Sequence, residues 1–495
     1  MPQASTDVLI CGAGAAGLTL AIELARRGVD FLLIDKAPVP FGGSRGKGIQ
    51  PRSQEVFEDM GVLDRMVAAG GRYPPQRAHK DGGFTDETMY EELAPTPAEP
   101  YRTALMLPQF LTEGLLRQRL IELGHAPRFG CELTGFKQDK SGVTAQIGAE
   151  TIRARYLVGA DGGRSFVRHA LGIEFPGKTL GIRAVVADLV LDGLSDDAWH
   201  RWNDGERNQM SLCPLRGTKL FQLQAPVPLE GEIDLTAKGL GAMIAERTGR
   251  ADLHVHSVTW ASAYNMNARL ADRYSVGRVY LAGDAAHIHP PTGGQGLNTS
   301  VQDAYNLGWK LAAVLRGAPE SVLASYEAER RPVAAEVLGL STKLLDALQQ
   351  RGEMRRGRET QQLDLGYPDT PLALKGDDDF TLQPGDRAPD APCSGAGGQR
   401  TRLFHLFKGT HWTLLGIGAD RSAIHTRHSL RIHGTGAGGD IVDCCGHIAE
   451  AYASAGWVLI RPDGYIAAVV SAQSTAALDA FLDSIGLTAA SLERV

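Results

Sequence analysis

Residues 6–35 read TDVLICGAGAAGLTLAIELARRGVDFLLID, and this stretch decides the fold of the first part of the chain. The apolar run at residues 6–11 predicts a short buried strand, and residues 29–35 predict a second one. Between them, residues 18–27 have helical spacing and end at Gly28, a natural helix stop. A strand, a helix and a strand in this order are typical of a parallel sheet, so we predict an α/β fold.

The turn between the first strand and the helix fits GxGxxG, a pattern that binds dinucleotides when it follows a strand and opens a helix. Gly12 permits the tight turn, Gly14 lets a pyrophosphate approach the backbone, and Gly17 lets the helix pack against the strand. The first helical turn offers free N–H groups and a positive dipole end to phosphate. Asp35 ends the second strand, where a carboxylate binds ribose hydroxyls. The predicted cofactor residues are Gly12, Gly14, Ala15, Ala16, Gly17 and Asp35, and the motif alone leaves FAD and NAD open.

The composition of the chain limits the classes of function. Its 495 residues are enough for two to four domains, and 43% hydrophobic with 22% charged residues is typical of a globular protein. Lys and Arg number 51 against 57 Asp and Glu, a net charge of −6 that argues against nucleic acid or a membrane as a partner. The six cysteines form no CxxC pair and no zinc pattern, so we expect reduced thiols, no metal site and a cytoplasmic protein.

Changes in composition and in the pattern of strand-like segments along the chain predict three domains. Residues 175–261 contain strand-like segments separated by polar turns, which indicates a β-rich insertion. Residues 376–392 are rich in Asp, Pro and Gly, the composition of a linker. A second GxGxxG match at residues 434–439 lacks a long following helix, so a surface glycine loop is favoured there. We predict a first domain at residues 1–174 and 262–383, the β-rich domain at residues 175–261, and a C-terminal α/β domain at residues 384–495. In this last domain, strand-like segments at residues 412–417, 430–433, 457–460 and 466–470 alternate with helical ones.

Further motifs follow the glycine motif in a fixed order. They are YLVGADGGRSFVRHALG at residues 156–172, RVYLAGDAAHIHPPTGGQGLN at residues 278–298, VQDAYNLGWK at residues 301–310 and YEAERRP at residues 326–332. Together these stretches resemble the group A flavoprotein aromatic hydroxylases, the para-hydroxybenzoate hydroxylase-like family, over about residues 6–335. The resemblance implies a Rossmann-like FAD-binding domain with a β-sheet substrate domain inserted into it.

The C-terminal part, with LIRPDG at residues 459–464, resembles the thioredoxin-like domain of the phenol and polyketide hydroxylase branch of this family. Redox work there is not expected, because the domain has no CxxC pair and Cys444 and Cys445 are adjacent. We therefore expect a structural role or a subunit contact, in a monomer or a homodimer.

By the same resemblance, several polar residues lie along the cofactor. Asp284 contacts the ribityl chain or the pyrophosphate of FAD, and Asp161 and Arg164 belong to a motif tied to both FAD and NAD(P)H. Arg45 and Gln109 fall at matching places beside FAD, and Lys36 lies near the adenosine. Next to the isoalloxazine ring the resemblance places Pro291, which positions the flavin, and Gly296, Leu297 and Asn298.

The resemblance implies an FAD-dependent monooxygenase. NADPH or NADH reduces the flavin, O2 then gives a C4a-hydroperoxyflavin, and this species hydroxylates a phenolic or polyketide-type aromatic substrate. A flavin-dependent oxidase or reductase of a non-aromatic substrate remains the alternative. For His287 and His289, local packing and hydrogen bonding are favoured over proton transfer.

Overall fold

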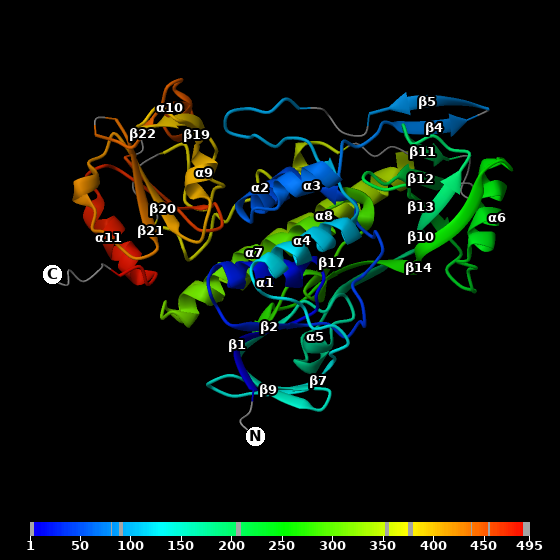
Figure 1. Ribbon diagram of the computed structural model, residues 1–495, viewed down its shortest axis with the longest axis horizontal. Helices are drawn as coiled ribbons and strands as arrows, with labels where there is room; N and C mark the ends of the chain where they lie inside the picture. Colours follow the sequence, from blue (N-terminus) through cyan, green and yellow to red (C-terminus); the bar gives the residue numbers. More distant parts are fainter. Residues whose placement is uncertain are drawn as a thin grey trace.

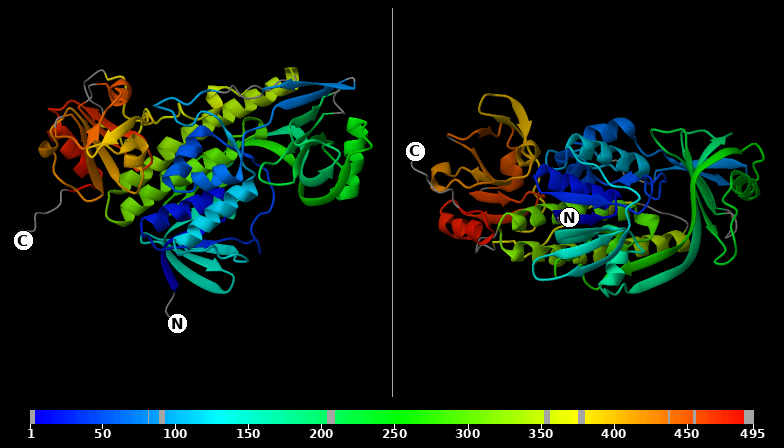
Figure 2. Two further views of the ribbon diagram at one scale, coloured as in Figure 1. Left: turned by 45° about the horizontal axis from the view of Figure 1, so that its top comes forward. Right: turned by 60° about the horizontal axis from the view of Figure 1, so that its bottom comes forward.

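The computed structural model describes residues 4–80, 82–88, 93–203, 209–351, 356–374, 380–436, 438–453 and 456–488, without the side chains of residues 348–351 (Figure 1). Within these ranges the strands form sheets of seven, eight and seven strands and one pair, β3 (Gly48–Ile49) with β6 (Leu105–Met106). The second sheet and the third sheet lie at opposite ends of the molecule, with the helices of the first domain between them (Figures 1 and 2).

The first sheet has a parallel centre, as the strand–helix–strand pattern predicts. In it β1 pairs in parallel with β2 and with β9, and β9 pairs in parallel with β16. The predicted strand at residues 6–11 lies within β1. Apolar side chains of β1 and β9 are buried because helices cover the sheet. The spatial order is β15 (Ser275–Val276), β16 (Val279–Leu281), β9 (Glu150–Gly159), β1 (Ala4–Cys11) and β2 (Phe31–Ile34), with the hairpin of β7 (Leu133–Gln138) and β8 (Val143–Ile147) on β9.

The helices of the first domain pack on one another as well as on the sheet. The helix α1 begins at Ala15, earlier than the apolar spacing predicts, because the glycine turn leads directly into it. The helix α7 is buried along almost its whole length between α1, α2 and α8. The helices are α1 (Ala15–Arg26), α2 (Pro51–Asp59), α3 (Leu63–Ala69), α4 (Gln109–Glu122), α5 (Phe166–Ala170), α7 (Gly296–Leu315) and α8 (Glu320–Arg351).

The second sheet is antiparallel apart from one parallel pair, and it extends beyond the predicted insertion at residues 175–261. Its last two strands, β4 and β5, come from residues 76–87, and β14 continues through the predicted boundary to Leu270. The sheet differs from the predicted insertion in extent because β14 stays paired with β10 across residue 261, and because β4 joins through a parallel pairing with β11 that leaves no local signal. The order is β17 (His287–Ile288), β14 (His254–Leu270), β10 (Gly177–Asp192), β13 (Phe221–Val227), β12 (Met210–Pro214), β11 (Trp199–Trp202), β4 (Gln76–Lys80) and β5 (Gly83–Glu87), with α6 (Ala237–Thr248) on β14.

The C-terminal part forms the third, mixed sheet. The predicted strands at residues 412–417, 457–460 and 466–470 are confirmed as β20, β23 and β24. The glycines after β21 lead into a strand, β22, rather than a helix, and Ala437 lies outside the described residues. Of the predicted linker, residues 376–379 also lie outside them. The order is β19 (Arg400–Arg402), β18 (Pro392–Gly395), β22 (Ile441–Val442), β21 (Leu430–Thr435), β20 (Trp412–Ile417), β23 (Trp457–Ile460) and β24 (Ile466–Val470), with α9 (Leu403–Phe407), α10 (His447–Tyr452) and α11 (Thr475–Ser484).

Candidate cofactor and active site

The carboxyl ends of four strands of the first sheet meet at one edge. Cys11 at the end of β1 is level with Ile34 of β2 and Gly159 of β9, and Gly159 is level with Leu281 of β16. The loops that follow these strands therefore start side by side. They carry the predicted residues Gly12, Asp35, Asp161 and Asp284. In open α/β sheets, ligands bind at this edge.

The glycine loop leaves space at one position and none at two others. Gly12 has a φ of 108°, and a Cβ there would lie 2.2 Å from the Ala160 carbonyl oxygen. A Cβ at Gly17 would lie 1.8 Å from the Gly12 carbonyl oxygen. At Gly14 the nearest described atom is Glu113 Oε1 at 3.7 Å. Gly12 and Gly17 thus serve packing, whereas Gly14 leaves room for a phosphate beside the first residues of α1, Ala15 and Ala16.

Asp35 ties the second strand to this loop. Its Oδ2 accepts a hydrogen bond from the Ala13 N–H at 2.7 Å, and its Oδ1 accepts one from the Ala37 N–H at 2.8 Å. The carboxylate is half-buried, while Lys36 beside it is exposed. Each carboxylate oxygen has a further lone pair for a sugar hydroxyl.

The start of α4 holds the loop that carries Arg45. The Gln109 N–H donates to the Gly46 carbonyl at 2.9 Å, and the Gln109 side-chain oxygen accepts from the Gly46 N–H at 3.3 Å. The exposed Arg45 guanidinium lies over the rings of Phe41, at 5.4 Å, and Trp260, at 5.9 Å. Trp260 belongs to β14, so Arg45 lies where the first domain meets the second sheet.

Glu113 is a buried site residue that sequence reasoning missed. Its Oε1 accepts a hydrogen bond from Gln109 Nε2 at 2.8 Å and faces the open side of Gly14. Burial raises the pKa of the Glu113 carboxyl to about 7, and the hydrogen bond from Gln109 and the charge of Arg117 oppose this rise. The spacing of Gln109 and Glu113, one helical turn apart, was the available signal.

The raised pKa of Glu113 predicts a stability that depends on pH. The folded chain keeps the proton up to about pH 7, whereas the unfolded chain releases it near 4.5, so the stability of the protein without cofactor falls as pH rises through this window. We expect Glu113→Gln to remove that part of the fall in the thermal midpoint between pH 5 and pH 8. The exposed Glu132→Gln is the matched control, and an unchanged fall in Glu113→Gln would contradict the assignment.

Asp161 and a missed arginine organise the next two loops. Asp161 Oδ2 accepts from the Val167 N–H at 3.1 Å, while its buried Oδ1 has no partner among the described residues. Arg164 is exposed. Arg168 donates to the Gly163 carbonyl at 2.9 Å and to the Ala285 carbonyl at 2.8 Å, so one buried side chain joins the loop after β9 to the loop after β16.

Asp284 combines an exposed side chain with a crowded environment. It lies in the short helix η1 (Gly283–Ala285), and its side chain is exposed. Surrounding protein atoms nevertheless raise the pKa of its carboxyl, against the opposing charges of His287 and Arg45. The Asp284 carboxylate is therefore accessible to a ligand despite the protein atoms around it.

The start of α7 is fastened to the segment that precedes α2. Asn298 Oδ1 accepts from the Gln50 N–H at 2.8 Å, and its Nδ2 donates to the carbonyls of Gly48, at 2.9 Å, and Gly294, at 2.8 Å. The N-terminal residues Gly296 and Leu297 stay half-exposed. Pro291, in η2 (Pro291–Gly293), is exposed. The N terminus of the 20-residue helix α7, with its partial positive charge, therefore lies beside the segment at residues 46–50 that follows Arg45.

Asp303 of α7 fixes the loop around Asp284 through hydrogen bonds. It accepts hydrogen bonds from the Gly283 N–H at 3.2 Å, from His287 Nε2 at 2.6 Å and from Arg330 Nε at 2.8 Å. His287 Nδ1 in turn pairs with His289 Nε2 at 2.9 Å, and burial lowers the pKa of His289 well below its usual value. Both histidines hydrogen-bond locally, as predicted, and the buried Asp303 was missed because its partners are distant in sequence.

On the side of the second sheet, Ser44 and Lys47 connect the Arg45 loop to β10 and β13. Asp188 accepts hydrogen bonds from the N–H of Ser44, at 2.8 Å, and from its hydroxyl. The Lys47 ammonium donates to Gln222 and lies 4.2 Å from the centre of the Trp199 ring. Burial lowers the pKa of Lys47. These contacts fix the second sheet against the Arg45 loop, which borders the predicted cofactor site.

The site residues fit a long dinucleotide such as FAD. The open backbone at Gly14, the accessible Asp284 and the unpartnered Asp161 Oδ1 are each suited to phosphate or hydroxyl groups. Among the described residues, no group of three or more His, Cys, Asp or Glu is placed to hold a metal ion. The described helices include none with the length and apolar character that a membrane span requires.

Comparisons with known proteins agree with this geometry. Residues 5–341 match the family described as FAD binding domain, and residues 381–486 match the family described as aromatic-ring hydroxylase, C-terminal. A flavin-dependent monooxygenase of Mycobacteroides abscessus is 42% identical, with 94% of this chain and 98% of the relative covered. The 12-dehydrotetracycline 5-monooxygenase/anhydrotetracycline 6-monooxygenase of Streptomyces rimosus is 33% identical, with 93% and 94% covered.

Solved structures are similar over the whole chain. The flavin-dependent monooxygenase PieE in complex with FAD and substrate is 26% identical, with a TM-score of 0.86 and coverage of 98% of this chain and 100% of the other. Aklavinone-11 hydroxylase in a ternary complex with FAD and aklavinone is 28% identical, with a TM-score of 0.83 and the same coverage.

Proposed function

Because this chain belongs to the FAD-dependent aromatic-ring hydroxylases, we propose that it binds FAD at the carboxyl edge of its first sheet and hydroxylates a multi-ring phenol. The chain is a flavin-dependent monooxygenase of aromatic compounds that uses FAD, O2 and a reduced nicotinamide. The observation that carries the proposed site is the convergence of the loops after β1, β2, β9 and β16 at one edge.

The proposal assigns each part of FAD to residues of this chain. The open N terminus of α1 takes the pyrophosphate and Asp35 the adenosine ribose, with Lys36 nearby. The groups assigned to the rest of the cofactor are Arg45, Gln109, Asp161, Arg164 and Asp284. Pro291, Gly296, Leu297 and Asn298 are assigned to the isoalloxazine ring.

Bound FAD supplies electron transfer from the nicotinamide and activation of O2. The chain's own residues bind, orient and protect the reacting groups. The N terminus of α7 stabilises negative charge beside Gly296 through its free N–H groups and its dipole. The second sheet, fixed to the Arg45 loop by Ser44 and Lys47, closes the site on its other side and excludes water.

The size of the substrate is part of the proposal. A relative named for 12-dehydrotetracycline and anhydrotetracycline, and a structural neighbour with bound aklavinone, support a multi-ring phenol over a small one. We also propose that the enzyme works in the cytoplasm, as a monomer or a homodimer. The six cysteines, all free in the structure, support a reducing compartment.

The test starts from the visible absorption spectrum of the purified protein. A flavin spectrum is expected, followed by oxidation of NADPH or NADH that one phenol of a panel accelerates with formation of a hydroxylated product. Oxygen uptake that yields only hydrogen peroxide with every phenol would indicate an oxidase. A colourless protein that FAD does not reconstitute would overturn the assignment of the site.

Asp35→Ala is expected to raise the dissociation constant of FAD by about 10-fold, because it removes the predicted ribose acceptor and the partner of the Ala13 N–H. Fluorescence titration of the protein without cofactor measures the constant. The neighbouring exposed Lys36→Ala is the control and should change it far less. Equal FAD affinity in Asp35→Ala and wild type would remove Asp35 from the site.

A further inference from the structure

The turn between β23 and β24 of the C-terminal domain carries a buried ion pair to the first domain. Arg461 donates to Glu329 of α8 through two parallel hydrogen bonds of 2.7 and 2.8 Å. The same guanidinium binds Asp463 at 2.9 and 2.6 Å. The side chains of Arg461 and Glu329 are 0% exposed and that of Asp463 is 1% exposed, so solvent does not screen these charges.

The same turn also binds α7 near the middle of this helix. Asp463 Oδ2 accepts hydrogen bonds from Trp309 Nε1 at 2.9 Å and from Asn306 Nδ2 at 3.1 Å. Trp309 meets Trp412 of β20 edge to face, with ring centres 5.5 Å apart. Apolar residues of the two domains therefore form one continuous core around this polar contact.

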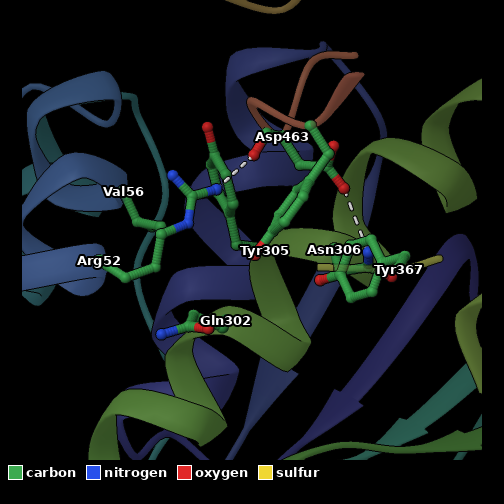
Figure 3. Close-up of a pocket in the computed structure, with 8 residues that line it drawn as sticks. Arg52, Val56, Gln302, Tyr305, Asn306, Tyr367 and Asp463 are labelled. Atoms are coloured by element: carbon green, nitrogen blue, oxygen red, sulfur yellow. Dashed lines mark hydrogen bonds between the residues drawn. The ribbon is translucent and has the colours of Figure 1, made fainter. Parts of the chain in front are cut away.

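A small polar cavity lies at this junction (Figure 3). Its volume of about 10 Å³ has room for one water molecule. Arg52 of α2 donates to the Asp463 carbonyl at 2.6 Å beside it. Buried polar atoms that line the cavity and have no partner among the described residues are Arg52 Nε, Gln302 Oε1, Asn306 Oδ1 and Tyr465 OH. The C-terminal domain thus reaches α2, α7 and α8 at one point.

From this point the charged contacts continue to the proposed flavin segment. Glu329 is followed on α8 by Arg330, whose Nε binds Asp303 at 2.8 Å and whose Nη1 donates to the Tyr367 hydroxyl at 3.1 Å. Asp303 holds the Gly283 N–H, at the start of the Asp284 loop. Arg330 Nη2 also approaches the Thr299 carbonyl, in the first turn of α7, at 3.4 Å.

We propose that Arg461 and Asp463 are positioning residues of the flavin site, and that the C-terminal domain serves to fix α7 and α8 under it. Buried ion pairs contribute little net stability, so we assign to this one the task of fixing the geometry of the elements that carry it. This inference rests on the proposed function, because it takes residues 283–298 as the segment that holds FAD. It gives the C-terminal domain a role that needs no redox chemistry.

Arg461→Lys tests the proposal, because lysine keeps the charge and loses the planar fork that binds Glu329 and Asp463 together. Arg427→Lys is the matched control. The Arg427 side chain is also largely buried in the same domain, but it binds the more exposed carboxylates of Asp479, at 2.7 Å, and Asp483, both in α11. Four quantities are measured: the thermal midpoint, the dissociation constant of FAD, the reduction potential of the bound flavin, and hydrogen–deuterium exchange of residues 283–300 without cofactor.

Arg461→Lys is expected to weaken FAD binding about 10-fold, to shift the flavin potential and to speed exchange at residues 283–300. Arg427→Lys is expected to lower the thermal midpoint alone. Asp463→Asn, which keeps the size of the side chain, is expected to follow Arg461→Lys, and it provides the test if Arg461→Lys does not fold.

Thermal midpoints that fall equally in the three variants, with unchanged FAD affinity, potential and exchange, would overturn the proposal. A wild-type protein that does not bind FAD would refute the proposed function instead. Exchange at residues 283–300 would then still decide whether Arg461 fixes this segment.

Discussion

Gly17→Ala is expected to abolish FAD binding, with a rise of at least about 100-fold in the dissociation constant. A Cβ at this position would lie 1.8 Å from the Gly12 carbonyl oxygen, so α1 has to move away from the glycine loop. The carbonyl oxygen belongs to the backbone and the Cβ is bonded directly to the backbone at Gly17, so no flexible side chain can give way. The displaced helix no longer presents its N terminus where the pyrophosphate is proposed to bind. Fluorescence titration with FAD measures the effect.

Gly14→Val separates crowding of the ligand from damage to the fold. The nearest described atom to a Cβ at Gly14 is 3.7 Å away, so this variant is expected to fold with nearly the wild-type thermal midpoint and still lose FAD. Gly17→Ala is expected to lose both FAD and thermal stability. If Gly14→Val binds FAD as the wild type does, the pyrophosphate does not lie at this loop.

Asp303→Ala is expected to lower the free energy of unfolding by about 3–5 kcal/mol, because it leaves the buried Arg330 without its counter-charge. It also removes the acceptors of the Gly283 N–H and of His287, so FAD should bind more weakly in the same variant. Urea unfolding and FAD titration measure the two effects.

Asp139→Ala provides the control for this second prediction. Asp139 also pairs with an arginine, Arg153, but both side chains are on the surface, so little stability should be lost. Equal losses of unfolding free energy in Asp303→Ala and Asp139→Ala would show that the Asp303 network does not contribute the stability predicted for it.

The sequence predicted those strands and helices that a short stretch of residues is enough to determine. The strands β20, β23 and β24 were predicted to the residue, because each is a short apolar run between turn residues. The opening strand and helix followed from the glycine motif. The continuation of the second sheet past residue 261 could not be predicted, because pairing with β10 holds β14 there and the sequence of β14 shows no special pattern at that point.

In the site, too, residues in local motifs were predicted and residues that act through distant partners were not. The motifs identified residues that follow the strand ends, such as Asp161 and Asp284, because these positions have a typical sequence. The buried residues that fix the loops were missed. Arg168 and Asp303 act through partners that lie 117 and 27 residues away in the chain, and no spacing rule connects such pairs.

The hairpin of β4 and β5 limits how this enzyme can be recombined with its relatives. The hairpin leaves the first domain and completes the second sheet through the parallel pairing of β4 with β11. A chimera that exchanges only residues 175–261 would cut β14 in two and leave Gln76 and its neighbours against a foreign edge. An exchange of substrate specificity therefore needs residues 76–87 and 177–270 to be transplanted together, as two separate pieces of chain that supply seven of the eight strands of the sheet, with β17 kept from the recipient.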